Sequence, residues 1–283
     1  MVSEPEGVKT VGVIGLGEMG LPMACNLAAR GFAVSGYDVR PQRVDALRQR
    51  GAGGVASAAA AAEGSDAVII MVRTPPQAEE VVLGRGAVLA QMRPGTLLIV
   101  MSTVGVACMR RLGEAARARA IGFLDAPVSG GRARAEDGTL TIIVGGTPED
   151  VTRGRPVLEA MGSRIAHVGE VGAGTAVKMA NQVLLTISLL AAREMSAVTG
   201  AAGIPPEAVW DVLRTCTGTT WVVEHWPVAA DWMEGYRPGS SLDILVKDTG
   251  LALDLAREEG VAAPLLGLAS QLLVALTRQL GGT

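Results

Sequence analysis

The sequence predicts an α/β protein in which a doubly wound, mostly parallel sheet is followed by an all-helical C-terminal domain. Short β-branched runs alternate with amphipathic stretches through residue 168, and this alternation is typical of a doubly wound sheet. Beyond Gly169 the alternation stops, and a long helical stretch over 172–199 leads into further helices. We therefore expect two domains, over residues 1–169 and 170–283, the second beginning with a long interdomain helix.

The expected strands of the first domain are short and apolar. Those at 67–72 and 96–102 are continuous apolar runs, as expected of strands that are buried on both faces. Gly31 is placed to end the first helix, Pro41 to open the second and Gly51 to end it. The predicted strands are 10–14, 33–38, 67–72, 96–102, 122–128, 140–145 and 164–168.

The long stretch at 172–199 carries apolar side chains on several faces, among them Leu184, Ile187 and Leu190. A helix that is apolar nearly all round is buried on several sides, so we expect it to pack in a subunit interface. Further helices follow to residue 280, with predicted breaks at 203–206, 227, 236–239 and 264.

Composition and charge argue against several functions. The net charge is −3 and aromatic residues make up 3%, so neither a basic face nor base-stacking platforms for nucleic acid are expected. The apolar run at 183–192 is shorter than the roughly 20 residues that span a bilayer. Because segment 1–9 is acidic and polar, it does not resemble a secretory signal. We expect a cytoplasmic protein that binds neither nucleic acid nor membrane.

Cysteine and histidine usage predicts neither disulfides nor a metal. Cys25, Cys108 and Cys216 lie far apart, which fits a reducing compartment, and we interpret all three as small buried apolar residues. The only histidines, His167 and His225, lack metal-ligand spacing. No Gly-x-Ser-x-Gly elbow supports a Ser-His-Asp hydrolase.

The sharpest local motif is Gly15-Leu16-Gly17-Glu18-Met19-Gly20, which lies between a predicted strand and a predicted helix. This context is the one in which Gly-x-Gly-x-x-Gly binds a dinucleotide. Gly15 permits the tight turn, Gly17 lets the backbone approach a pyrophosphate, and Gly20 allows close helix packing. The helix N-terminal amides then face the phosphates. The alternatives are turn chemistry alone or the glycine-rich turn of a methyltransferase.

Asp38 ends the second predicted strand, about 20 residues after the glycine motif, where an acidic side chain can bind the adenosine ribose hydroxyls. Its charge would repel a 2′-phosphate, so NAD is favoured over NADP. Arg40, two residues on, could soften that preference.

Three further segments have the residue types of a substrate site. Asp125 to Gly131 follows an apolar strand, and its Ser129 hydroxyl and Gly130-Gly131 amides would suit a carboxylate, although a plain glycine turn is an equal alternative. Lys178 and Asn181 share one face of the long helix.

Burial would lower the pKa of Lys178 and make its amine a useful acid or base near neutrality. The alternative is a lysine whose stem is buried and whose charge pairs with a carboxylate. Lys247-Asp248 lies in an apolar stretch and could supply a cation for a substrate carboxylate, or it could be an exposed ion pair.

Taken together, these segments resemble the β-hydroxyacid dehydrogenase family, which contains 3-hydroxyisobutyrate dehydrogenase and tartronate semialdehyde reductase. Four family motifs appear in order across nearly the whole chain: 15–20 with Pro22-Met23, 125–131, 172–181 and 247–248. The stretches 218–221, 236–238 and 242–248 look most like the threonate dehydrogenase subgroup, which hints at a four-carbon sugar acid.

The resemblance implies a role for each matching residue. Lys178 matches the catalytic lysine, Asn181 the substrate-orienting asparagine, and Ser129, Gly130 and Gly131 the substrate-carboxylate loop. Ser102 and Thr103 fall beside nicotinamide and substrate, and Lys247 closes over the substrate. The implied cofactor contacts are Gly15, Leu16, Gly17, Glu18, Met19, Gly20, Asp38, Val72, Thr103 and Lys247. The implied architecture is a Rossmann domain, a long interdomain helix and a helical domain that builds dimers or tetramers.

The expected function is therefore NAD-dependent oxidation of the β-hydroxyl of a small hydroxy acid, with NADP as a possible cofactor and Lys178 as the proton-transfer residue. Candidate substrates are 3-hydroxyisobutyrate, glycerate or tartronate semialdehyde, threonate and serine-like acids. The alternatives are an imine or ketone reductase on the same scaffold, and a non-catalytic NAD-binding sensor. Lys178, Asn181 and Lys247 argue against the sensor, because a sensor has no need of a proton donor.

Overall fold

The computed structural model describes residues 7–281, so most of the segment 1–9 that is unlike a secretory signal lies outside the described residues. The chain forms two compact units, of which the first ends at Lys178 and the second begins at Met179.

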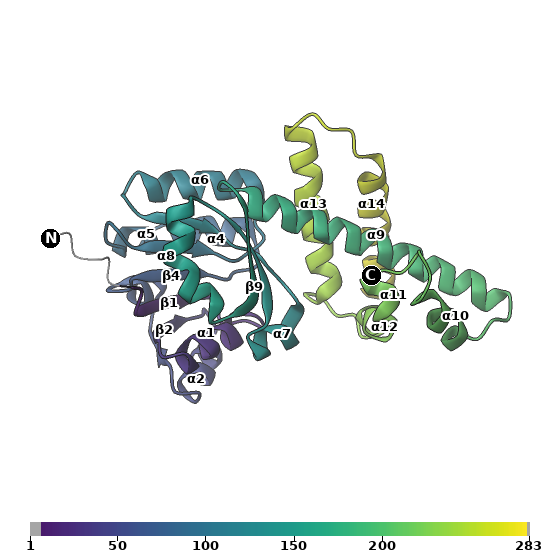
Figure 1. Cartoon of the computed structure of the whole chain (residues 1–283), viewed down its shortest axis with the longest axis horizontal. Coiled ribbons are helices and arrows are strands. Elements are labelled where there is room, and N and C mark those ends of the chain that lie inside the picture. The colour runs from purple at the N-terminus through teal and green to yellow at the C-terminus, as the bar shows by residue number, and fades with distance from the viewer. Residues whose placement is uncertain (1–6, 282–283) are drawn as a thin grey trace. The chain divides into compact units, whose positions relative to one another are not determined.

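The first unit is built on one sheet, whose strands are seen in Figure 1. Its six parallel strands run in the order β3-β2-β1-β4-β5-β6, which is the strand order of a Rossmann sheet. Strand β8 pairs antiparallel with β6 and β7, and parallel with β9. The predicted doubly wound sheet is thus confirmed. The strands are β1 (Thr10–Ile14), β2 (Ala33–Tyr37), β3 (Gly53–Gly54), β4 (Ala67–Ile70), β5 (Leu97–Val100), β6 (Gly122–Asp125), β7 (Val128–Ser129), β8 (Leu140–Gly145) and β9 (Gly162–Gly169).

Helices cover both faces of this sheet. Neighbouring residues of one strand enter different apolar clusters: Ile69 packs with residues of α1, α2 and α8, whereas Ile70 packs with residues of α3 to α6. This alternation explains why β4 and β5 have no polar positions, since both of their faces are buried. The helices are α1 (Gly20–Ala29), α2 (Pro41–Arg48), α3 (Ala58–Ala62), α4 (Pro75–Leu83), α5 (Val88–Gln91), α6 (Val106–Arg117), α7 (Gly131–Asp137) and α8 (Pro148–Glu159).

Two strand predictions are corrected. The strand expected over 122–128 ends at Asp125, and Val128–Ser129 forms the separate strand β7 after Pro127, which has no N–H to donate to a ladder. Strand β3 was not expected, because glycine disfavours strands. It forms because Gly53 and Gly54 pair with Ser35 and Gly36 at the edge of the sheet.

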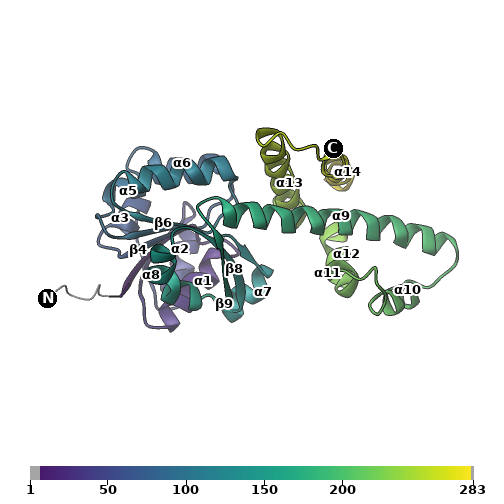
Figure 2. The ribbon, with the colours of Figure 1, turned by 45° about the horizontal axis from the view of Figure 1, so that its top comes forward.

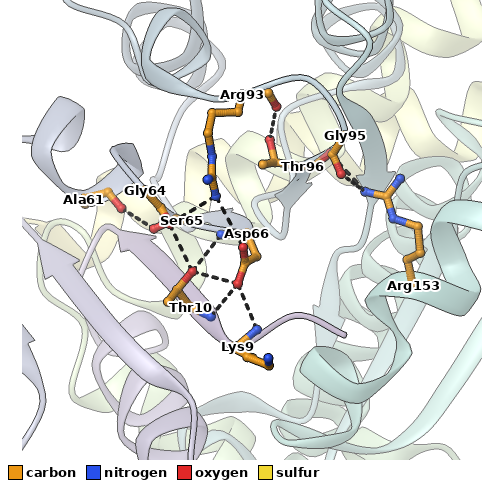
Figure 3. Close-up of polar contacts among 10 residues, drawn as sticks. All are labelled: Lys9, Thr10, Ala61, Gly64, Ser65, Asp66, Arg93, Gly95, Thr96 and Arg153. Carbon is orange, nitrogen blue, oxygen red and sulfur yellow. Dashed lines mark hydrogen bonds and ion pairs between the residues drawn. The ribbon is translucent and has the colours of Figure 1, made fainter. Parts of the chain in front are cut away.

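A polar network ties together the amino ends of β1 and β4 (Figure 3). The Asp66 carboxylate accepts hydrogen bonds from the amides of Lys9 and Thr10, at 3.0 and 2.9 Å, and from Thr10 Oγ1 at 2.8 Å. The Arg93 guanidinium lies 3.4 Å from the same carboxylate. Arg153 donates to the carbonyl oxygen of Gly95 nearby. Because ligands of such sheets bind beyond the carboxyl ends of the strands, this network at the opposite edge is structural.

The second unit is helical throughout its described residues, which extend to 281. Figure 2 shows α9 (Ala173–Ala201) as one continuous helix, which begins in the first unit and continues into the second. Side chains from α9 to α14 form one apolar core, including Leu189, Trp210, Leu245 and Leu273. The other helices are α10 (Pro206–Leu213), α11 (Trp221–Glu224), α12 (Trp226–Glu234), α13 (Ser241–Glu258) and α14 (Pro264–Gly281).

The helix breaks predicted at Pro227 and Pro264 are confirmed, since α11 ends at Glu224 before α12 begins, and α13 ends at Glu258 before α14 begins. Each proline lies at the start of the following helix, Pro227 in the first turn of α12 and Pro264 as the first residue of α14. A proline is well suited to these positions, because the first-turn N–H groups have no partner within the helix and the ring fixes a helical φ.

Helix α9 is long and apolar enough to cross a bilayer, judged by length and composition alone. The apolar part of this helix is therefore longer than the run 183–192 from which the sequence analysis argued. In its most apolar window 44% of the residues are buried inside the protein, and the core helix of a folded domain has the same character. The cytoplasmic location stays a prediction.

The cysteines are not alike. Cys108 is buried, and desolvation together with the charge of Glu79 raises the pKa of its thiol to about 12. Cys25 is half-buried and Cys216 is exposed, so the expectation of three buried cysteines is wrong for Cys216.

Candidate active site

The glycine motif lies at the carboxyl end of β1, and its three glycines have different surroundings. A Cβ atom at Gly15, where φ is +96°, would lie 2.2 Å from the carbonyl oxygen of Met71. A Cβ atom at Gly20 would lie 1.8 Å from the oxygen of Gly15. At Gly17 the nearest atom would be Arg40 Nη2, at 3.9 Å. The chain's own packing therefore requires Gly15 and Gly20, whereas the space beside Gly17 is open to a ligand.

The start of α1 also fits a bound pyrophosphate. Met19 occupies the cap position, and its side chain makes no capping hydrogen bond to the first turn. The Leu21 and Met23 amides donate to the carbonyl oxygens of Gly17 and Met19, and Pro22 has no N–H, so the backbone ahead of Leu21 would meet an anion at this helix N-terminus. The open space at Gly17 and this uncapped turn together fit the phosphates of a dinucleotide.

Asp38 follows β2 and is 8% exposed. Its carboxylate accepts hydrogen bonds from the Leu16 amide at 2.9 Å and from the Arg40 amide and Nε at 2.9 and 3.1 Å. Burial acts to raise the pKa of Asp38, but these hydrogen bonds outweigh it and hold the pKa below its usual value. Asp38 is thus an anion at neutral pH, with Arg40 directly beside it.

Glu18 connects the glycine motif to distant parts of the first unit. Its carboxylate pairs with Arg43 of α2 at 3.1 Å and with Arg132 of α7 at 2.8 Å. Hydrogen bonding from Arg43, ahead of the charge of Arg132, lowers the pKa of Glu18. Arg132 directly follows Gly131, so this ion pair links the cofactor motif to the predicted substrate loop. The sequence held no signal for a contact across 114 positions.

The carboxyl ends of β4 and β5 are joined by Ser102. Its hydroxyl accepts a hydrogen bond from the Val72 amide at 2.8 Å and donates to the carbonyl oxygen of Ile70 at 3.3 Å. Ser102 is 2% exposed, whereas Thr103 is half-buried. The Ser102 hydroxyl therefore holds the carboxyl ends of β4 and β5 together. The roles of Ser102 and Thr103 toward the substrate stay predictions.

The predicted carboxylate loop begins in β7, where Ser129 pairs with Thr141 of β8. Gly130 and Gly131 follow with φ values of +127° and +69°, in the region that favours glycine, and both are exposed. A Cβ atom at Gly130 would lie 2.5 Å from Arg134 Cδ, so a larger residue would both displace that side chain and strain the backbone at this φ.

Asp125, at the end of β6, anchors the start of α9. It is fully buried and accepts hydrogen bonds from the amides of Gly172 and Thr175, at 3.0 and 2.9 Å, and from Thr175 Oγ1 at 2.6 Å. Desolvation raises the pKa of Asp125 to about 6, although the bonds from Thr175 and Gly172 act to lower it. Lys178 lies one turn beyond Thr175 and is 8% exposed. The expectation of a buried Lys178 is therefore confirmed.

A second polar network lies wholly in the second unit, with Gln182 and Asp248 buried and Asn181 exposed, so the expectation that Asn181 is buried with Lys178 is wrong. Asn181 Nδ2 donates to Gln182 Oε1 at 3.0 Å, and Gln182 Nε2 donates to Asp248 Oδ2 at 2.7 Å. Lys247 Nζ lies 2.6 Å from Asp248 Oδ1. Asp248 is 1% exposed and Lys247 is 24% exposed, so the alternative prediction of an exposed ion pair on the helix surface is wrong. Sequence reasoning missed Gln182, whose partner is 66 positions away.

The histidines have structural contacts. His167 Nε2 lies 2.9 Å from the carbonyl oxygen of Gly146, and His225 Nδ1 lies 3.0 Å from that of Trp221. Among residues 7–281 no three His, Cys, Asp or Glu side chains are grouped as metal ligands.

Comparison with known proteins agrees with this geometry. Residues 10–169 match the family described as the NAD binding domain of 6-phosphogluconate dehydrogenase. Residues 172–283 match the family described as NAD-binding of NADP-dependent 3-hydroxyisobutyrate dehydrogenase.

Individual relatives match over nearly their whole length. The NAD-dependent L-serine dehydrogenase of Pseudomonas aeruginosa is 36% identical, over 96% of this chain and 93% of the relative. The L-threonate dehydrogenase of Cupriavidus necator is 37% identical, over 97% and 93%. A solved structure of Mycobacterium tuberculosis 3-hydroxyisobutyrate dehydrogenase with L-serine has a TM-score of 0.86 and 34% identity, covering 95% of this chain and 93% of that one. The chain therefore belongs to the β-hydroxyacid dehydrogenase family and is an NAD(P)-dependent oxidoreductase acting on hydroxy acids.

Proposed function

We propose that this protein oxidises the β-hydroxyl of a small hydroxy acid and that Lys178 exchanges the hydroxyl proton. One observation carries the proposal: Lys178 is a nearly buried amine on a helix whose start is hydrogen-bonded to Asp125, four residues before Ser129. When bound, NAD accepts the hydride from the carbon that bears the hydroxyl. The chain's own residues bind and orient the acid and move the proton.

Each residue has a distinct part in this proposal. The Ser129 hydroxyl and the Gly130 and Gly131 amides bind the substrate carboxylate, since all are hydrogen-bond donors, Ser129 at the half-buried end of β7 and the two glycines exposed beyond it. The Lys178 amine accepts the β-hydroxyl proton during oxidation and returns it during reduction. Only the uncharged form of this amine can accept that proton.

We propose NAD as the preferred cofactor. Asp38 stays ionised at neutral pH, and its charge opposes a 2′-phosphate, whereas ribose hydroxyls can donate to it. Arg40 already uses its Nε on Asp38, which reduces its availability to a phosphate. NADP is therefore expected to be accepted more weakly.

The proposed substrates are three- and four-carbon β-hydroxy acids. Serine and threonate dehydrogenases are equally similar to this chain, at 36% and 37% identity, so overall similarity does not choose between them. We place L-serine first, because a structurally similar protein is described in complex with it. 3-Hydroxyisobutyrate, glycerate and L-threonate complete the panel.

The test is Lys178→Ala, assayed for NADH production on this panel with NAD and NADP in parallel. Loss of a positioned acid–base group should lower kcat by about 10²- to 10⁴-fold, with NADH affinity within twofold of wild type. Lys9→Ala, which removes an exposed lysine, is the matched control. A variant with wild-type kcat would show that Lys178 is not the proton-transfer group. No turnover by the wild type, with tight NADH binding, would favour the imine-reducing or sensor function.

We also propose that the protein is a homo-oligomer, a dimer or a tetramer. Helix α14 has two apolar faces. One face is buried in the core of the second unit, at Ala269, Leu273 and Leu276. The other carries Leu265, Leu268 and Leu272, whose exposed fractions are 58, 57 and 40%. Adjacent exposed leucines on one helix face are typical of a surface that another protein chain covers.

A further inference from the structure

Asp125 is a fully buried carboxylate to which the proposed reaction gives no task. An unpaired buried charge is strongly unfavourable, so such a group is found where hydrogen bonds compensate it. Here both oxygens are used: Oδ2 accepts from the Gly172 and Thr175 amides, and Oδ1 accepts from Thr175 Oγ1. All three donors belong to the segment that begins α9, 47 to 50 positions further along the chain.

This arrangement makes Asp125 the cap of α9, supplied by a distant strand in place of a neighbouring residue. The first amides of a helix have no partner within it. A carboxylate at this position also interacts favourably with the positive end of the helix dipole. Thr175 is likewise fully buried, and it binds the carboxylate through two atoms. Rotation or sliding of the first turn of α9 would break both of these bonds.

Backbone packing adds to the constraint. A Cβ atom at Gly174 would lie 2.6 Å from the carbonyl oxygens of Asp125 and Ile143, so the first turn of α9 rests directly on the ends of β6 and β8. A Cβ atom at Gly145 would lie 2.5 Å from the oxygen of Glu170. Only glycine permits this approach, and therefore the start of α9 has one closely defined position on the sheet.

Lys178 lies on the same helix face as Thr175, one turn later and about 4.5 Å further along the axis. Asp125 also precedes the loop that contains Ser129, with only Ala126, Pro127 and Val128 between them. One buried carboxylate is therefore in contact with the helix that carries the amine and continuous with the loop that carries the hydroxyl.

We infer that Asp125 and Thr175 are positioning residues for Lys178, holding its amine in register with the Ser129 loop so that the substrate proton can be transferred. This inference rests on the proposed function of Lys178. Misplacement of a reacting group by about 1 Å can cost on the order of 10²-fold in rate, and neither residue needs to touch the substrate to have this effect.

The test compares Thr175→Val with Thr175→Ser. Valine keeps the shape and loses the hydroxyl that donates to Asp125, whereas serine retains it. At about pH 8, above the Asp125 pKa of about 6, Thr175→Val should lower kcat by about 10- to 100-fold, with the Kd for NADH within twofold. Thr175→Ser should stay within about threefold of wild type. A purely structural role would instead lower the folded fraction and affect NADH binding and kcat together.

Hydrogen–deuterium exchange gives a second measurement that does not depend on turnover. The amides of residues 172–176 should exchange faster in Thr175→Val than in Thr175→Ser. Asp125→Asn should change kcat and amide exchange in the same direction as Thr175→Val does. The double variant should have the same kcat as Asp125→Asn alone, because both substitutions remove the same hydrogen bond between Thr175 and Asp125. If Thr175→Val retains both wild-type kcat and wild-type exchange, the inference is wrong.

Lys178→Ala separates the two proposals. In that background Thr175→Val should have no further effect on the residual kcat, because the group that it positions is gone. If Lys178→Ala loses kcat while Thr175→Val does not, only the positioning role fails. If Lys178→Ala retains kcat, the proton-transfer role itself fails.

Discussion

Residues of the same type have different roles in the glycine motif. Gly15 and Gly20 allow the chain to pack on itself, since Cβ atoms there would overlap backbone oxygens of Met71 and Gly15. Gly17 has no such neighbour, and its nearest atom is the end of a flexible arginine side chain. We therefore predict that Gly17 serves cofactor binding, whereas the close backbone contact at Gly20 serves folding.

This difference predicts opposite results for two alanine variants. Gly17→Ala should raise the Kd for NADH by at least about tenfold, because the methyl group occupies the space of the pyrophosphate, with little change in Tm. Gly20→Ala should instead destabilise the protein by about 1–3 kcal/mol, because backbone atoms must move to admit the methyl group. Fluorescence titration with NADH and thermal unfolding measure the two effects. Equal NADH affinity of Gly17→Ala and wild type would contradict the assignment.

At the scale of elements, buried or half-buried carboxylates join segments that are distant in sequence. Asp125 joins β6 to α9, Asp248 joins α13 to Gln182 of α9, and Asp66 joins the start of β4 to the start of β1. In each case the carboxylate accepts several hydrogen bonds, so losing it leaves more than one donor without a partner.

Asp66 gives a test of this principle through pH. Burial acts to raise its pKa, but hydrogen bonds from Lys9 and Thr10 and the charge of Arg93 hold the pKa below the usual value. A carboxyl with a lowered folded-state pKa stabilises the protein above its unfolded pKa, about 3.9, and loses that effect as pH falls through the folded value. Asp66→Asn should therefore lower Tm at neutral pH.

The difference in Tm between wild type and Asp66→Asn should shrink below about pH 4, where the wild-type carboxyl becomes protonated. Asp137→Asn, which changes an exposed aspartate, is the control and should have no such pH-dependent difference. A constant difference between Asp66→Asn and wild type down to about pH 2 would show that the charge of Asp66 does not matter.

At the scale of the whole molecule, the exposed leucine face of α14 predicts self-association. Leu268→Glu combined with Leu272→Glu should convert an oligomer to a single chain in light scattering, because charged side chains cannot be buried without partners. Gln271→Glu adds a charge at an exposed position of the same helix and should leave the mass unchanged. A wild-type protein with the mass of one chain would contradict the proposal.

The sequence by itself determined those features that depend on local chemistry. The glycine motif, the apolar strands, the helix boundary at Pro41 and the long helix of α9 are encoded by neighbouring residues, because turn geometry, burial and helix periodicity act over a few positions. The resemblance to the family rests on the same short motifs. Lys178 was expected to be buried because the residues around it in sequence are apolar.

Only the tertiary structure decided which side chains meet. Asp125 and Thr175, Gln182 and Asp248, and Glu18 and Arg132 are separated by 50, 66 and 114 positions, and no local pattern pairs them. The two-residue strand β3 exists only because β2 offers it a ladder. The physical reason is the same in each case: a buried polar group takes as its partner whichever donor the fold brings within about 3 Å, and that distance is set by the packing of the whole unit.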